Sequence, residues 1–169
     1  GGGDDVVHGG ADDDRLYGGA GNDTMFGEAG QDILWGEEGD DVLDGGAGDD
    51  TVKGGAGNDV LTGGEGSDWL GGGADRDVLH AGAGDYADGG SEGDDYDVLD
   101  LTNIGRYRIN NLTRDLNGNG WNGTVVLLDD NGDPTGETIR FDEIEGFVEP
   151  PHGGPDGTVE GSAGDDLID

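Results

Sequence analysis

A nine-residue unit repeats without interruption from the N-terminus to residue 80, and this period restricts the fold more than any other feature of the chain. The stretch Gly18–Phe26 reads GGAGNDTMF, and it is followed by GEAGQDILW, GEEGDDVLD, GGAGDDTVK and GGAGNDVLT. With Gly18 as position 1, Asp stands at position 6 and Val, Leu or Met at position 8 in nine consecutive units. A fixed period predicts a stack of short units, each of which can bury its apolar residue only against its neighbours.

Within each unit, the residue types predict a tight turn followed by a short strand. Glycines at positions 1, 2 and 4 permit positive φ angles and close approach of the backbone. Positions 7–9 are expected to form the strand, with the position-8 side chain pointing inward because side chains alternate between faces. The core is then one side chain wide and contributes roughly 1.5–3 kcal/mol per buried residue. Ordering the backbone costs about 1–2 kcal/mol per residue, so we expect a bound ion to stabilise the turns.

The acidic composition indicates which ion this is. The 169 residues include 41 Asp and Glu against 7 Lys and Arg, which gives a net charge of −34. This charge disfavours binding to nucleic acid, and the absence of cysteine excludes disulfides and thiolate metal sites. Carboxylate and carbonyl oxygens suit Ca²⁺, whereas Mg²⁺ requires a stricter octahedron and Zn²⁺ prefers Cys and His. We therefore expect Ca²⁺.

The pattern GGxGxD, followed by any residue, an apolar residue and any residue, resembles the RTX (repeats-in-toxin) nonapeptide. The resemblance covers Gly1 to about Leu101 and returns at Gly161–Asp169. It implies an all-β fold, a right-handed parallel β-roll with two units per coil. It also implies that Ca²⁺ lies between one turn and the turn two units later, with position-6 carboxylates and alternate turn carbonyls as ligands.

Carried onto this chain, the resemblance names a set of ligands in two rows. The regular position-6 side chains are Asp5, Asp14, Asp23, Asp32, Asp41, Asp50, Asp59, Asp68 and Asp77. Less regular matches further on are Asp85, Asp95, Asp97 and Asp166. The turn carbonyls include those of Gly18, Ala20, Gly27, Ala29, Gly36, Glu38, Gly45, Ala47, Gly54 and Ala56. Consecutive pairs within the two rows predict about 7–10 Ca²⁺ ions.

The segment after the repeats has a different composition and a different expected role. We expect residues 1–101 to form the roll, 102–150 a β-rich cap, 151–160 a Pro- and Gly-rich linker and 161–169 the restart of a repeat. The stretches RYRIN, GTVVLLD and ETIRF read as strands, and a hairpin through residues 129–136 joins the last two. A cap is expected because an open last coil exposes apolar residues and strand edges.

Other motifs in the chain carry less information. Asp115, Asn117 and Asn119 begin an EF-hand-like loop, but Val126 replaces the closing Glu, so a further Ca²⁺ site and a plain Asn-Gly turn are both open. Residues 118–123 match GxGxxG without a strand and helix around them. Ser91 lies in a GxSxG match that lacks the flanks of a nucleophile elbow. No catalytic constellation is visible, so we do not expect an enzyme.

These observations predict a calcium-binding structural module whose folding is triggered by extracellular Ca²⁺. The resemblance implies part of a large secreted or cell-surface bacterial protein that leaves the cell by type I secretion. No apolar run approaches a membrane span, and the chain begins and ends within repeats, as expected of a fragment. Two alternatives are a non-catalytic accessory module of a secreted enzyme and a module that binds a glycan or partner through Tyr17, Trp35 and Trp69.

Overall fold

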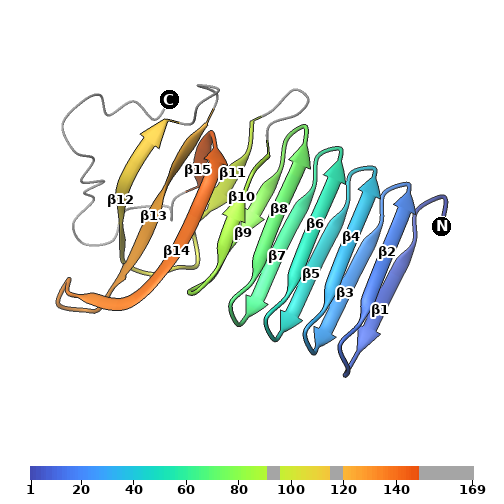
Figure 1. The fold of residues 1–169 in the computed structure, drawn as a ribbon, viewed down its shortest axis with the longest axis horizontal. Helices are drawn as coiled ribbons and strands as arrows, with labels where there is room; N and C mark the ends of the chain where they lie inside the picture. The colour runs from blue at the N-terminus through green and yellow to red at the C-terminus, as the bar shows by residue number, and fades with distance from the viewer. Residues whose placement is uncertain (91–95, 115–119, 149–169) are drawn as a thin grey trace.

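The computed structural model describes residues 1–90, 96–114 and 120–148, and within them the chain forms two β-sheets that face each other. The strands form a stack that runs from the N-terminus to a β-rich cap at the other end (Figure 1). No helix in these three ranges is long and apolar enough to cross a membrane. The fold is all-β, a parallel β-solenoid of about five turns, as the repeats predict.

Alternate strands along the chain enter opposite sheets. The seven-stranded sheet contains, in order of pairing, β1 (Val6–Gly10), β3 (Thr24–Ala29), β5 (Val42–Ala47), β7 (Val60–Glu65), β9 (Val78–His80), β11 (Val98–Asp100) and β15 (Gly146–Val148). The eight-stranded sheet contains β2 (Arg15–Ala20), β4 (Ile33–Glu38), β6 (Thr51–Ala56), β8 (Trp69–Ala74), β10 (Tyr86–Asp88), β14 (Pro134–Ile144), β13 (Trp121–Leu128) and β12 (Tyr107–Arg114). Each coil of the roll therefore contributes one strand to each sheet.

The register stacks identical positions of the unit on one another. Thr24 lies opposite Val42 and Met25 opposite Leu43, a separation of 18 residues, or two units. The position-8 side chains consequently form one buried column from each sheet. Those that are completely buried in the roll are Met25, Leu34, Leu43, Val52, Leu61, Leu70, Leu79, Ala87 and Leu99. This is the narrow core that the period predicts.

The strands are longer than the sequence pattern indicates. Each full repeat strand has six residues and runs from position 7 through position 3 of the next unit, as in β5 (Val42–Ala47). Only positions 4–6 remain for the turn. Glycine at position 1 thus lies inside a strand, while positive φ angles occur at positions 2 and 4, as at Gly46 (103°) and Gly48 (138°). The expectation that position 1 also needs a positive φ was wrong.

The cap joins the roll by continuing both of its sheets. Strands β12, β13 and β14 form an antiparallel meander, and the β13–β14 hairpin turns through residues 129–133, close to the predicted segment. β14 then pairs in parallel with β10, and β15 pairs in parallel with β11. The last coil of the roll is therefore covered on both sheets. The expected linker at 151–160 and the repeat restart at 161–169 lie outside the described residues.

Candidate calcium sites

The position-6 aspartates form two buried rows, one along each line of turns. Each of the nine carboxylates from Asp23 to Asp97 in these rows is at most 3% exposed. One oxygen of each carboxylate has a defined structural role. The Asp41 Oδ1 accepts a hydrogen bond from the Asp23 backbone N–H at 2.7 Å, and the Asp59 Oδ1 accepts from Asp41 at 2.8 Å. The same bond joins every pair of neighbouring coils, so each Asp fixes the turn of the coil before it.

The second oxygen of these carboxylates is the unusual feature. In the interior of the rows, Oδ2 is buried and accepts no hydrogen bond from the described residues; the atoms concerned are those of Asp23, Asp32, Asp41, Asp50, Asp59 and Asp68. A buried carboxylate oxygen without a donor or cation is costly. Each row contains three such atoms, one per coil and therefore two units apart, which points to a positively charged ligand that recurs along each row.

Each of these oxygens borders a small space beside a position-1 glycine and the position-1 carbonyl oxygen of the next coil, and we call this space the cradle. A Cβ atom placed on Gly45, at position 1, would lie 2.6 Å from the Asp50 Oδ2 and 2.6 Å from the carbonyl oxygen of Gly63 in the next coil. Comparable crowding occurs at Gly9, where the Asp14 Oδ2 and the Gly27 carbonyl oxygen lie at 2.9 and 2.8 Å. Glycine at position 1 therefore leaves room beside a carboxylate and a carbonyl oxygen. Both are hard oxygen donors of the type that Ca²⁺ prefers.

Burial raises the proton affinity of the rows. It raises the pKa of Asp59 to about 8, although the hydrogen bond from the Asp41 N–H opposes the shift, and the nearby Asp77 and Asp41 add to it. Burial likewise raises the pKa of Asp68 to about 6. The pKa values of Asp41 and Asp50 are also raised, chiefly by burial. Without a cation, these carboxylates are poorly accommodated in their charged form.

The carbonyl groups named from the sequence fall into two sets. Position-1 carbonyls such as those of Gly27 and Gly54 border the cradles. Position-3 carbonyls instead accept a backbone hydrogen bond, as Glu38 does from the Gly21 N–H at 2.9 Å. No three His, Cys, Asp or Glu side chains converge on one point in the described ranges, so backbone oxygens must complete each coordination sphere.

Beyond residue 80, only some of the predicted ligands keep the hydrogen-bond pattern of the position-6 rows. Asp97 continues its row, because its Oδ1 accepts from the Asp77 N–H at 2.8 Å. Asp85 also accepts from the previous coil, but its Oδ2 accepts from the Gly82 N–H at 2.6 Å. The other predicted ligands lie outside the described residues: Asp95, Asp166, Asp115, Asn117 and Asn119.

A second ladder of hydrogen bonds, not expected from the sequence, runs along position 5. The Asp40 Oδ1 accepts from the Asn58 N–H at 2.8 Å, and the Asp49 Oδ1 accepts from the Ser67 N–H at 2.9 Å. Here the later coil donates to the earlier one, opposite to the position-6 ladder. The alternation of Asp, Asn and Ser at position 5 was the signal, because these side chains readily accept turn N–H groups.

The aromatic residues form a stack on the outer face of the eight-stranded sheet. The rings of Tyr17 and Trp35 lie 4.5 Å apart at an angle of 6°. Further along, the Lys53 Nζ lies 5.0 Å from the centre of the Trp69 ring, which stacks on Tyr86 at 6.5 Å. The rings therefore form two stacked pairs, with Lys53 beside the second, and the Tyr17 ring remains 53% exposed.

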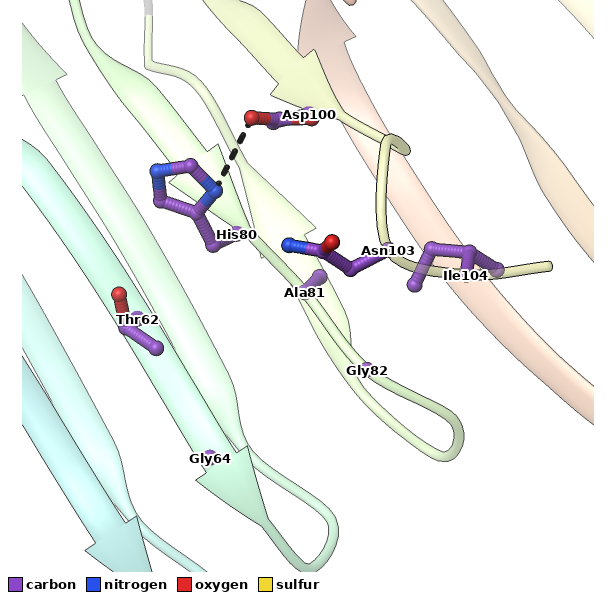
Figure 2. Close-up of a pocket in the computed structure, with 8 residues that line it drawn as sticks. All are labelled: Thr62, Gly64, His80, Ala81, Gly82, Asp100, Asn103 and Ile104. Atoms are coloured by element: carbon purple, nitrogen blue, oxygen red, sulfur yellow. Dashed lines mark ion pairs between the residues drawn. The ribbon is translucent and has the colours of Figure 1, made fainter. Parts of the chain in front are cut away.

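A shallow pocket of about 230 Å³ lies against the seven-stranded sheet near the start of the flank. In Figure 2 the His80 imidazole points toward Asp100, with its Nδ1 3.2 Å from the Asp100 Oδ2. Thr62, on the neighbouring strand, lies apart from this pair, and no hydrogen bond among the described residues links it to His80. Within residues 1–90, 96–114 and 120–148, the pair does not extend to a nucleophile.

Comparison with known families agrees with this geometry. A model of the RTX calcium-binding nonapeptide repeat matches the chain in four copies, at residues 1–34, 27–61, 35–70 and 62–85. These copies span residues 1–85, half of the 169-residue chain. No match was found among curated proteins. The chain therefore belongs to the family of RTX calcium-binding nonapeptide-repeat proteins, and Ca²⁺ is the ion that its repeats bind.

Proposed function

We propose that this chain is a structural module whose folding is triggered by Ca²⁺ outside the cell, within a larger secreted or cell-surface protein. The observation that carries the proposal is the set of six buried Oδ2 atoms with no donor among the described residues. When bound, Ca²⁺ supplies the positive charge that these carboxylates lack. Binding only to the folded chain then adds directly to its stability.

The ligands in this proposal come from the position-6 row and the cradle carbonyls. The side chains are Asp5, Asp14, Asp23, Asp32, Asp41, Asp50, Asp59, Asp68, Asp77 and Asp97. Each of these carboxylates would bind Ca²⁺ together with the position-1 carbonyl oxygen of the following coil. A position-3 carbonyl oxygen uses one lone pair in its backbone hydrogen bond and has a second lone pair available to bind the ion. Asp85 is left out of this set because both of its oxygens already accept hydrogen bonds.

The role of the module is structural and not catalytic in this proposal. Residues 1–101 form the roll and residues 102–150 its cap. In this proposal the module is unfolded where Ca²⁺ is scarce and folds into a rigid roll where Ca²⁺ is abundant. Ca²⁺ is abundant outside a cell. A role as an accessory part of a secreted enzyme agrees with the same mechanism. The ring-on-ring stacking of Tyr17 and Trp35 gives less support to a glycan platform.

A Ca²⁺ titration followed by far-UV circular dichroism tests the proposal. At about pH 8, where the buried carboxylates no longer hold protons, we expect a coil-like spectrum in metal-free buffer and a β spectrum after addition of CaCl₂. In Asp41→Asn, the Asn oxygen still accepts the Asp23 N–H while the charge is lost, so we expect fewer bound ions and a higher midpoint. Asp12→Asn, which changes the charge of an exposed residue equally, should match the wild type. A β spectrum that is unchanged by Ca²⁺ would refute Ca²⁺-triggered folding.

A further inference from the structure

The cap continues the repeat register although its sequence does not repeat. In each coil, the position-7 N–H donates to the position-6 carbonyl of the coil before it, as Val42 does to Asp23 at 2.9 Å. In the cap, the Arg140 N–H donates to the Asp85 carbonyl at 3.0 Å, and the Gly146 N–H donates to the Asp97 carbonyl at 2.9 Å. The residues before them, Ile139 and Glu145, therefore occupy position 6 of an additional half-coil on each sheet.

One of the two rows ends at an apolar residue. Ile139 is completely buried and follows Asp85 in the row along the eight-stranded sheet. Its side chain offers no oxygen to a cation. The preceding carboxylate is also occupied, because the Asp85 Oδ2 accepts from the Gly82 N–H. A Cβ on Gly82 would be 3.6 Å from that oxygen, so the narrow cradle is absent as well.

The other row continues into the cap with a carboxylate. The Glu145 Oε2 accepts a hydrogen bond from the Asp97 N–H at 2.7 Å. This bond is equivalent to the one that the Asp97 Oδ1 accepts from the Asp77 N–H at 2.8 Å. The longer Glu side chain thus takes the place of a position-6 Asp. Its second oxygen, Oε1, is shielded from solvent, as is the Asp97 Oδ2.

The cradle is also reproduced at this junction. A Cβ on Gly89 would lie 2.5 Å from the Asp97 Oδ2 and would contact the carbonyl oxygen of Glu143. That carbonyl takes the place of the position-1 carbonyl, as Gly63 does beside Gly45. On the cap side, a Cβ on Gly120 would be 2.6 Å from the Glu145 Oε1, so glycine leaves space there too. Two glycines therefore border a space lined by carboxylate and carbonyl oxygens.

We propose that Asp97, the Glu143 carbonyl and Glu145 form a Ca²⁺ site at the junction between roll and cap. The proposal rests on the ligand role proposed above for the position-6 carboxylates. It adds that the ion at the end of one row fastens the cap at β15, while the other edge, at β14, is held by apolar packing around Ile139. Docking of the cap is then dependent on Ca²⁺ along one sheet only.

Ion counting on the full chain tests this site. Bound Ca²⁺ is measured by equilibrium dialysis against saturating CaCl₂ in the wild type, in Glu145→Gln and in Glu137→Gln. Gln keeps an oxygen for the Asp97 N–H, so we expect one ion fewer in Glu145→Gln. Glu137 is exposed on β14, and its substitution makes the same change in charge, so Glu137→Gln should bind as many ions as the wild type.

Hydrogen exchange provides a readout that is specific to one edge of the cap. We expect the Gly146 amide, which bonds to Asp97, to exchange about tenfold faster in Glu145→Gln, because losing the junction ion weakens docking by about 1.4 kcal/mol. The Arg140 amide, which bonds to Asp85 on the apolar edge, should change less. Equal acceleration at both edges would contradict the one-sided attachment.

The ion count separates this proposal from the one on which it rests. An unchanged count in Glu145→Gln, with a reduced count in Asp41→Asn, overturns the junction site alone. Unchanged counts in both variants overturn the ligand role of position 6 as well. If the cap of Glu145→Gln fails to fold, Glu145→Asp, which keeps the charge, decides the question. Recovery of the fold together with the ion supports the site, and recovery of the fold without the ion overturns it.

Discussion

At the scale of single residues, glycine has two different functions in the repeat. At positions 2 and 4 it adopts positive φ angles, as Gly46 and Gly48 do. At position 1 its backbone is compatible with any residue, and the constraint is the space beside a carboxylate and a carbonyl oxygen. Substitutions at these positions should therefore fail for different reasons: strain of the backbone at one, and filling of the cradle at the other.

Gly45→Ala tests the cradle without introducing backbone strain. Its Cβ would be 2.6 Å from both the Asp50 Oδ2 and the Gly63 carbonyl oxygen. We expect a decrease of about 1–3 kcal/mol in the free energy of unfolding at saturating Ca²⁺, together with the loss of one bound ion. Gly82→Ala is the control, since its nearest atom would be 3.5 Å away. Equal stability of the two variants in urea titrations would contradict the steric explanation.

Glutamate at position 2 is strained where glycine is usual. Glu37 has a φ of 83°, a region that costs an L-residue about 1–2 kcal/mol. We expect Glu37→Gly to raise the free energy of unfolding by about 0.5–1 kcal/mol, the gain being reduced by the entropy of glycine in the unfolded chain. Glu38→Gly removes the same charge at a position with ordinary φ and should lower stability by about 0.5–1 kcal/mol. Urea denaturation at fixed Ca²⁺ measures both, and a loss of stability in Glu37→Gly would show that φ is not limiting there.

At the scale of elements, the sequence predicts the roll well because its constraints are local and repeated. The spacing of Asp23 and Met25 indicates the turn and the inward side chain of every unit. The length of the strands was underestimated, because glycine at positions 1 and 2 resembles a turn in the sequence and lies within a strand in the structure. The sequence alone does not indicate whether a glycine is required for a positive φ angle or for the space that its missing side chain leaves.

The docking of the cap could not be predicted in the same way. Its strands were expected from their alternation, but their pairing with β10 and β11 depends on contacts across about 50 residues of sequence. One signal was present: Glu145 precedes Phe147 by two positions, the spacing of the acidic and apolar residues in the repeat. A single match without a period carries little weight, so Glu145 was overlooked.

Phe141 should be the main apolar contribution of the cap to the roll. It is 1% exposed, lies opposite Ala87 in β10 and contacts Phe147 edge-on at 5.2 Å. We expect Phe141→Ala to lower the free energy of unfolding by about 3–5 kcal/mol. Val42→Ala, on the outer face of β5, should cost less than about 1 kcal/mol. Similar losses in the two variants, measured by urea denaturation at fixed Ca²⁺, would show that the cap is not packed as described.

At the scale of the whole molecule, charge opposes folding unless it is neutralised. The chain carries a net charge of −34, and its two rows align carboxylates in consecutive coils. In metal-free buffer, protons can neutralise these buried oxygens, because burial raises the pKa of their carboxyl groups. Stability must therefore depend on pH in opposite ways with and without Ca²⁺.

The direction of this dependence follows from the raised pKa values. Asp59 has a pKa of about 8 in the folded, ion-free roll, against about 3.9 in an unfolded chain. Between these values the folded state holds a proton that the unfolded state has released. The free energy of unfolding of the ion-free chain therefore falls as pH rises from about 4 to about 8. Ca²⁺ requires deprotonated carboxylates, so its affinity rises over the same range.

We expect the metal-free chain to show its largest β signal near pH 4–5 and to lose it by about pH 8. At subsaturating CaCl₂ the β signal should instead increase with pH, as protons leave the rows. Far-UV circular dichroism across this range, in buffers freed of metal by a chelating resin, measures both dependences. Asp59→Asn, which cannot titrate at that position, should flatten the metal-free curve between about pH 4 and pH 8, the range in which folded Asp59 keeps a proton that the unfolded chain has released. A metal-free signal that rises with pH would mean that Asp59 is charged in the ion-free folded state, and that its burial is compensated by something other than a proton.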